Sequence, residues 1–232
     1  MAKDMRSYLS DFRKHFPDQY IEIDREVDPL YEVATIQKKL AKEGRHPILQ
    51  FNNVKGSEIP LICNLYATRR HIAFALGTTE QELQNFYRYA EDHPIDPIYV
   101  DDAPSQEIVL TGDDVDLTKL PVCKSHGPDI GPYLTATLVL ANDPESGAHN
   151  VSFGRLQLVD QNTCYTHITP GRHLHVIHSS YEKQNKPLPV SINIGLHPAW
   201  ALGGTSLVSM EFDELRVAGG LAKEAVRLTR CK

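Results

Sequence analysis

The sequence has few cysteines, and they do not form the patterns of a zinc ribbon or a disulfide scaffold. Cys63, Cys123, Cys164 and Cys231 are far apart and form no Cys-x-x-Cys pair. We therefore expect free thiols buried in the interior. The chain also lacks a His-Glu-x-x-His zinc signature, internal repeats and low-complexity segments.

Long apolar runs and an excess of basic residues are absent as well. No apolar run reaches the roughly 18 residues that span a bilayer, and residues 1–6 are polar, unlike the start of a signal peptide. The 24 basic and 30 acidic residues are intermixed and give a net charge of -6. This balance argues against nucleic acid or a membrane as the main partner. We expect a cytoplasmic protein.

The length of 232 residues, with 41% hydrophobic and 23% charged residues, suits a soluble globular protein. Residues 1–105 alternate helical and strand patterns, as an α/β domain does. Residues 106–131 form a proline-punctuated connecting segment, and residues 132–232 form a sheet-rich second domain. Acidic residues at 113, 114 and 116 in the connection could bind a metal, but a solvated run is the favoured interpretation.

Hydrophobic periodicity and capping residues predict the elements of both regions. In the first region we expect helices at 5–15, from Asp28 as N-cap to Gly44, and after Thr68 and Thr78, with strands at 21–27, 47–54 and 59–64. In the second we expect an antiparallel pair at 134–141 and 151–159, helices at 171–181 and 214–221, strands at 188–194 and 224–230, and a small-residue turn at 195–206.

Three polar segments of the second region carry residues suited to chemistry: Asn150-Val-Ser-Phe-Gly-Arg155, Gly171-Arg172-His173 and Asp213-Glu214. An amide oxygen, an imidazole and a carboxylate can hold a divalent ion, and an arginine can pair with a carboxylate. On a strand, positions 150, 152 and 154 share a face, and position 155 faces the other side unless Gly154 marks a bulge. Spacing alone still favours an edge strand with a solvated polar face.

Two of these features have simple structural alternatives. The start of the helix near Arg172 would favour an anion, as helix N-termini do. Glu214 alone would ordinarily be a helix-start carboxylate, and the glycine-rich loop before Ser206 matches neither a Walker loop nor a dinucleotide fingerprint.

Taken together, the motifs resemble the UbiD family of decarboxylases. The resemblance rests on Phe51-Asn-Asn-Val-Lys-Gly56, Asn150 to Arg155, Gly171-Arg-His-Leu174, the loop before Ser206, and Asp213-Glu-Leu-Arg-Val-Ala-Gly-Gly220. It implies an α+β protein in which an N-terminal α/β domain is followed by an incomplete flavin-binding split β-barrel. With this resemblance, a metal site formed by the polar segments becomes the favoured interpretation, ahead of an edge strand with a solvated polar face.

The resemblance implies prenylated FMN as cofactor, with a divalent metal, typically Mn²⁺, and K⁺ at its phosphate. Asn150, His173 and Glu214 would be the metal ligands, and Arg155 would bind the carboxylate of the substrate. The resemblance places a further set of residues along the cofactor: Asn150, Ser152, Arg172, Thr205 and Ser206.

The implied activity is reversible non-oxidative decarboxylation of an aromatic or α,β-unsaturated acid. The family's paired catalytic glutamates and dimerising C-terminal domain do not occur in these residues. We therefore expect an N-terminal portion, truncated or split, which forms a homo-oligomer or joins a companion chain in the intact enzyme. The alternatives are a non-catalytic flavin-binding or assembly module and an inactive truncated fragment.

Overall fold

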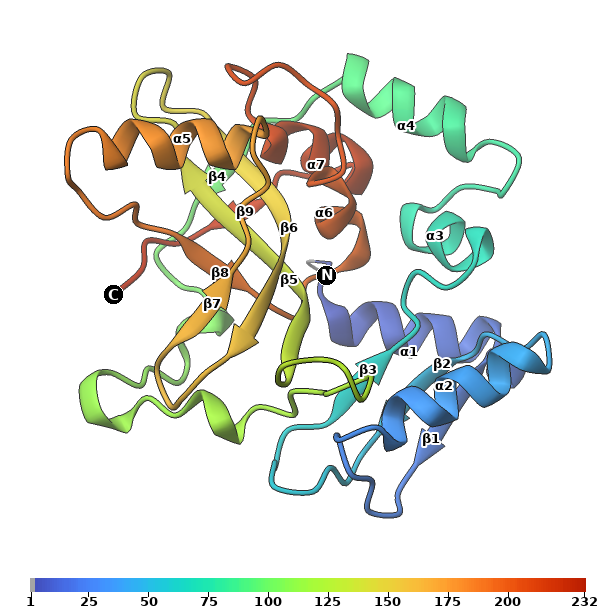
Figure 1. The fold of residues 1–232 in the computed structure, drawn as a ribbon. Helices are drawn as coiled ribbons and strands as arrows, with labels where there is room; N and C mark the ends of the chain where they lie inside the picture. The colour runs from blue at the N-terminus through green and yellow to red at the C-terminus, as the bar shows by residue number, and fades with distance from the viewer. Residues whose placement is uncertain (1–2) are drawn as a thin grey trace.

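The computed structural model describes residues 3–232, and its mixture of helices and strands confirms the α+β class (Figure 1). The helices are α1 (Met5–His15), α2 (Glu32–Lys42), α3 (Arg69–Leu76), α4 (Leu83–Asp92), α5 (His173–Glu182), α6 (Pro198–Gly203) and α7 (Glu214–Ala222). The strands are β1 (Tyr20–Ile23), β2 (Ile48–Phe51), β3 (Leu61–Cys63), β4 (Ile98–Tyr99), β5 (Tyr133–Asn142), β6 (His149–Leu158), β7 (Cys164–Thr166), β8 (Ser191–Asn193) and β9 (Arg227–Leu228).

The first part of the chain builds a small mixed sheet in the order β1-β2-β3. Strands β1 and β2 are parallel, whereas β2 and β3 are antiparallel. A fully buried apolar cluster lies between this sheet and α2; it consists of Val27, Val33, Leu49, Phe51 and Val54. The predicted helix at 5–15 is confirmed as α1, which Asp4 caps through a reciprocal bond with Ser7.

Two predicted helix starts, after Asp28 and after Thr78, are wrong because backbone N–H groups there bond outside the expected helix: Tyr31 to Lys124 and Thr78 to Ala73. Helix α2 begins at Glu32, four residues after Asp28. The Asp28 carboxylate accepts from the N–H of Leu30 at 2.8 Å, and Tyr31 donates to the carbonyl of Lys124 at 2.8 Å. This segment is therefore held as a bridge to the connecting region. Helix α4 begins at Leu83, well after Thr78.

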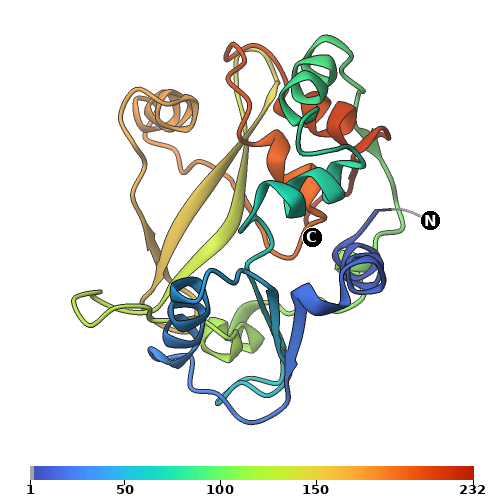
Figure 2. The same ribbon diagram turned by 90° about the vertical axis from the view of Figure 1, so that its right-hand side faces the viewer.

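The second part builds a four-stranded antiparallel sheet in the order β7-β6-β5-β8. Strands β5 and β6 confirm the predicted long pair. Helix α5 lies on one side of these strands, and α6 and α7 lie on the other (Figure 2). Closure of this sheet into a split barrel stays a prediction.

The two parts share a hydrophobic core. Helices α3 and α4 pack on α6 and α7, through a cluster that includes Leu76, Leu83, Val217 and Leu221. Strand β4 also pairs in parallel with β9. Residues of the predicted first domain thus pack directly on the second, and the proposed boundaries at 105 and 131 stay predictions.

The predicted turn at 195–206 instead contains helix α6. His197 caps this helix by accepting from the N–H of Ala199 at 3.1 Å. A Cβ on Gly203 would lie 2.4 Å from the Cβ of Ala218, so this glycine allows α6 and α7 to touch. Its small size therefore allows close helix packing.

The four cysteines are free, as expected, but they are not fully buried. Cys231 is exposed and the other three are half-buried. Within residues 3–232, no helix has both the length and the apolar character needed to cross a bilayer.

Candidate metal and cofactor site

Strand β6 carries the first predicted polar segment, and its pairing with β5 determines which way the side chains face. Asn150 and Ser152 lie opposite Ala141 and Val139. Alternation along the strand places Gly154 on the same face. A Cβ at Gly154 would lie 2.7 Å from Cγ2 of Val139, so packing between the strands requires glycine there.

Arg155 lies opposite an irregularity in the same pairing. The register shifts between Leu134 and Thr137 of β5, so two residues of β5 oppose Arg155. This β-bulge has its extra residue on β5, and Gly154 is not the bulge. Side chains on β6 therefore keep alternating, and the exposed Arg155 lies on the opposite face from Asn150.

Glu214, the first residue of α7, reaches the start of β6 although 64 residues separate it from Asn150. Its Oε2 accepts from Nδ2 of Asn150 at 3.1 Å and from the backbone N–H of Val151. Strand β7 pairs with β6 only at residues 156–158, so within residues 3–232 this part of β6 has no neighbouring strand on that edge. The carboxylate therefore satisfies a backbone donor that would otherwise be buried without a partner.

His173, the first residue of α5, brings in the third predicted ligand. Its Nδ1 lies 3.5 Å from Oε1 of Glu214. Helix α5 packs against β5 and β6, which holds His173 beside the end of the sheet. The structure thus gathers Asn150, His173 and Glu214 from three separate elements around one carboxylate.

The Glu214 carboxyl is an unusual group because it is almost fully buried. Asn150 and Glu214 are 7% and 5% exposed. Burial raises the pKa of Glu214 to about 7, and the neighbouring Asp213 carboxylate adds to this rise. The N–H of Val151 and the amide of Asn150 oppose it. A bound cation would favour the ionised carboxylate, as metal ions do for buried acids.

Two buried polar atoms on this face of β6 have no hydrogen-bond partner among residues 3–232: Oδ1 of Asn150 and Oγ of Ser152. Buried polar atoms are nearly always bonded, so these two indicate a place for a ligand. An amide oxygen, an imidazole nitrogen and a carboxylate oxygen suit a cation such as Mn²⁺ or Mg²⁺. The residues present fit a divalent ion, and the adjacent Ser152 hydroxyl fits a polar group of a cofactor.

Across residues 3–232, no three His, Cys, Asp or Glu side chains are arranged to hold a metal ion. Asp113, Asp114 and Asp116 form no such group within these residues. The candidate set lies outside this residue class because the amide of Asn150 is one of its three members.

The two predicted arginines lie on the surface. Arg172 is the N-cap residue of α5 and makes no side-chain bond to the helix. Both guanidinium groups are exposed, and in the part of the chain that the structure describes neither pairs with a carboxylate. The N-terminus of α5 and Arg172 together can attract an anion.

Thr205, which is exposed, and Ser206, which is buried, follow α6 and use their hydroxyl groups in bonds to other residues of the chain. They donate to the carbonyls of Leu202 and Gly203, each at 2.7 Å. The phenol of Tyr87 lies 2.9 Å from the Thr205 hydroxyl and 3.2 Å from that of Ser206. These bonds connect α4 to the end of α6, and the structure does not bring either hydroxyl to Glu214.

Sequence reasoning named Asp213 only as part of a polar segment and missed His149, its partner. His149 donates from Nδ1 to Oδ2 of Asp213 at 2.6 Å, and its Nε2 lies 3.4 Å from the hydroxyl of Tyr99. His149 and Asp213 each directly precede a predicted ligand, Asn150 and Glu214. That adjacency is the signal that could have indicated the bond between them.

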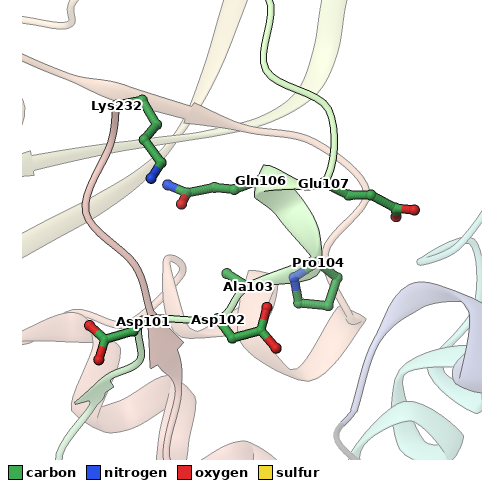
Figure 3. Close-up of a pocket in the computed structure, with 7 residues that line it drawn as sticks. All are labelled: Asp101, Asp102, Ala103, Pro104, Gln106, Glu107 and Lys232. Carbon is green, nitrogen blue, oxygen red and sulfur yellow. The ribbon is translucent and has the colours of Figure 1, made fainter.

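A separate hollow of about 450 Å³ lies near the connecting segment (Figure 3). Its lining is formed by Asp101, Asp102, Ala103, Pro104, Gln106, Glu107 and Lys232. None of the candidate site residues lines it, and its three carboxylates would repel an acidic substrate. The candidate site is therefore the polar cluster at the start of β6.

Comparison with known proteins identifies the family. Residues 98–232 match the family model described as 3-octaprenyl-4-hydroxybenzoate carboxy-lyase Rift-related domain, and residues 14–87 match the corresponding N-terminal domain. Gallate decarboxylase of Lactiplantibacillus plantarum is 33% identical over 97% of this chain and 49% of its own length.

Solved structures agree with the sequence relatives. An evolved dimeric form of the UbiD-class enzyme HmfF from Pelotomaculum thermopropionicum, in complex with prFMN, matches all of this chain and 53% of its own at a TM-score of 0.92 and 30% identity. The 3,4-dihydroxybenzoic acid decarboxylase of Enterobacter cloacae matches at a TM-score of 0.87 and 32% identity, over 100% of this chain and 50% of its own. The chain spans about half the length of the curated relatives it matches. Two family models over most of its length show that the chain belongs to the UbiD family of carboxy-lyases.

Proposed function

We propose that this chain forms the cofactor- and metal-binding half of a decarboxylase that uses prenylated FMN. The substrate class is an aromatic or α,β-unsaturated carboxylic acid, and the reaction is reversible non-oxidative decarboxylation. The observation that carries the proposal is the meeting of Asn150, His173 and Glu214, with Oδ1 of Asn150 buried and free of hydrogen bonds among residues 3–232.

In this proposal the three residues hold a divalent ion, Mn²⁺ being the preferred candidate. Glu214 supplies an anionic oxygen and Asn150 a neutral oxygen, while His173 supplies a nitrogen. The metal, with K⁺, would neutralise the phosphate of the flavin. Ser152 and Arg172 would contact the cofactor, and the same role for Thr205 and Ser206 requires their bonds to Leu202 and Gly203 to be exchanged.

Prenylated FMN, when bound, would accept the electrons that remain on the acid as carbon dioxide departs. The protein's part is to orient the acid and to bind its carboxylate, for which Arg155 is the proposed group. Arg155 is exposed and lies on the opposite face of β6 from Asn150. Binding in this role therefore requires its long side chain to turn around the strand edge, or the acid to reach that face.

Proton transfer in the family depends on a pair of glutamates outside these residues. We propose that they come from further sequence or from a companion chain, in a homo-oligomer or mixed assembly. A relative in the structural comparison is described as dimeric. We also propose that the second domain is an incomplete split β-barrel, and that the chain divides into regions 1–105, 106–131 and 132–232.

The test is reconstitution of the chain with prenylated FMN and Mn²⁺, followed by flavin absorbance and by the affinity for each component. We expect Asn150→Ala, His173→Ala and Glu214→Ala to weaken Mn²⁺ and flavin binding at least tenfold, because each removes a ligand. Arg155→Ala should keep cofactor affinity and weaken the binding of an aromatic acid. Unchanged affinity in all three ligand variants would overturn the metal assignment.

Turnover distinguishes the enzyme from a binding module. Release of carbon dioxide by the chain, alone or with a companion segment, supports the decarboxylase. Tight flavin binding without turnover in either preparation would favour a non-catalytic flavin-binding module.

A further inference from the structure

A second polar link lies directly beside the proposed metal ligands. Asn150 and Glu214 connect β6 to α7, and the residues before them, His149 and Asp213, connect the same two elements. The second bond joins Nδ1 of His149 to Oδ2 of Asp213 at 2.6 Å, and the two side chains are 11% and 17% exposed. Two neighbouring links therefore join the start of β6 to the start of α7.

We propose that His149 and Asp213 are positioning residues that hold Asn150 and Glu214 at the separation needed to bind one cation. The inference deepens the proposed function and rests on it. We refer to the His149–Asp213 bond as the brace. Because the brace is made entirely by the protein, it holds the two elements together before a metal binds.

Hydrogen bonds to both carboxylate oxygens fix the orientation of the Asp213 side chain. Its Oδ1 accepts from the N–H of Leu215 at 2.8 Å, which caps α7, and its Oδ2 accepts from His149. Both oxygens are used, so rotation of the carboxylate would break one of the two bonds. Asp213 thus fixes the start of α7, where Glu214 begins, relative to β6.

Tyr99 completes the arrangement from β4. Its hydroxyl lies 3.4 Å from Nε2 of His149. Because a carboxylate only accepts, the Nδ1 of His149 must carry a proton, and a neutral ring then accepts from Tyr99 through Nε2. This ring orientation points the donor at Asp213 and not at the proposed ligands.

The brace matters because the ligands themselves are costly to hold together. Glu214 is buried, and Oδ1 of Asn150 is buried with no hydrogen-bond partner among residues 3–232, so without metal their arrangement is unfavourable. An external constraint reduces the reorganisation that accompanies metal binding. Partners that orient metal ligands typically change metal affinity by about 10–100-fold when removed.

The experiment compares two replacements of His149 in the chain. In His149→Asn the side-chain amide places an N–H near the position of Nδ1, whereas His149→Phe fills the space without a donor. We expect Mn²⁺ affinity, measured by calorimetry and by electron paramagnetic resonance of free Mn²⁺, to fall about tenfold in the Phe variant. The Asn variant should stay within about threefold of the unsubstituted chain.

Asp213→Ser supplies a second route to the same result. Serine can cap α7 in place of Asp213 but cannot reach His149. We expect a loss similar to that of His149→Phe, and no further loss in the double variant, because both substitutions break one bond. A purely structural role would lower the free energy of unfolding and leave the Mn²⁺ affinity of the folded chain unchanged.

Each outcome has a distinct meaning. Wild-type affinity in both His149→Phe and Asp213→Ser would overturn the brace alone, and equal losses in His149→Asn and His149→Phe would overturn the role of the Nδ1 donor. Failure of the unsubstituted chain to bind Mn²⁺ would overturn the proposed function and the brace with it. Nitrogen-15 chemical shifts of His149 test the geometry without metal: a neutral ring with an unprotonated Nδ1 contradicts it.

Discussion

At the scale of single residues, the family resemblance predicted the candidate ligands but not the hydrogen bonds that surround them. Asn150, His173 and Glu214 were predicted as ligands from the resemblance to the UbiD family, and the structure brings them together. The bond between His149 and Asp213 spans 64 residues of sequence, so no local pattern contains it. Only the folded arrangement of β6 against α7 reveals why a histidine and an aspartate precede the ligands.

His197 gives a prediction for the dependence of stability on pH. It is 5% exposed, and burial lowers its pKa to about 4; Lys3 also lowers it, while Glu224 and Asp4 oppose the shift. The unfolded chain binds a proton at His197 near pH 6.5, whereas the folded chain does so only near pH 4. The contribution of the neutral His197 ring to the free energy of unfolding is therefore complete above about pH 6.5. It is lost as pH falls from about 6.5 to about 4.

The size of this contribution is about 3 kcal/mol. We expect urea unfolding to show a free energy of unfolding that falls on acidification, and His197→Asn should show a shallower fall. Asparagine can still cap α6, so the comparison isolates protonation from capping. The same slope in both proteins between pH 7 and pH 4.5 would contradict this account.

At the scale of elements, the sequence predicted the helices and strands that have strong local signals. It did not predict the features that depend on tertiary contacts. Helix α1 and the β5–β6 pair have caps or long apolar alternation, and both were predicted. The start of α2 was wrong because Lys124, far away in the sequence, bonds to Tyr31. Helix α6 was missed because glycines are typical of a turn. Their role in the packing of α6 against α7 depends on a tertiary contact.

The contact of α6 with α7 predicts a marked sensitivity at Gly203. In Gly203→Ala the new methyl group would meet Ala218, with Cβ atoms 2.4 Å apart, so the helices must separate. We expect a loss of about 1–3 kcal/mol in the free energy of unfolding, measured with urea. Gly127→Ala is the matched control, because nothing lies within 4 Å of its Cβ. An equal effect at both sites would refute the packing argument.

At the scale of the whole molecule, the core crosses the boundary that composition indicated. Ala73, Leu76, Leu83 and Ala90 pack with Val217 and Leu221 in one cluster. The proline-rich connection suggested two regions, because a sequence pattern shows where the chain is irregular but not which helices it brings together. The described residues therefore behave as one packed body at this cluster.

This shared core predicts a single cooperative unfolding transition. Trp200, the only tryptophan, packs against the cluster, whereas far-UV circular dichroism reports on helices and strands throughout the chain. We expect the two signals to give the same midpoint. Leu221→Ala should lower the free energy of unfolding by about 2–5 kcal/mol and shift both midpoints together. An earlier transition seen only by circular dichroism would show that the predicted first domain unfolds separately.

The bulge opposite Arg155 restricts how strand β5 can evolve. Two residues of β5 stand against one of β6 between Leu134 and Thr137. Deletion of either would leave one residue of β5 opposite Arg155 and give regular pairing, so the strand would lose the local bend and added twist that a bulge provides. Related sequences should therefore vary in side-chain identity along this stretch while keeping its length, and alignment gaps should fall in the 143–148 turn.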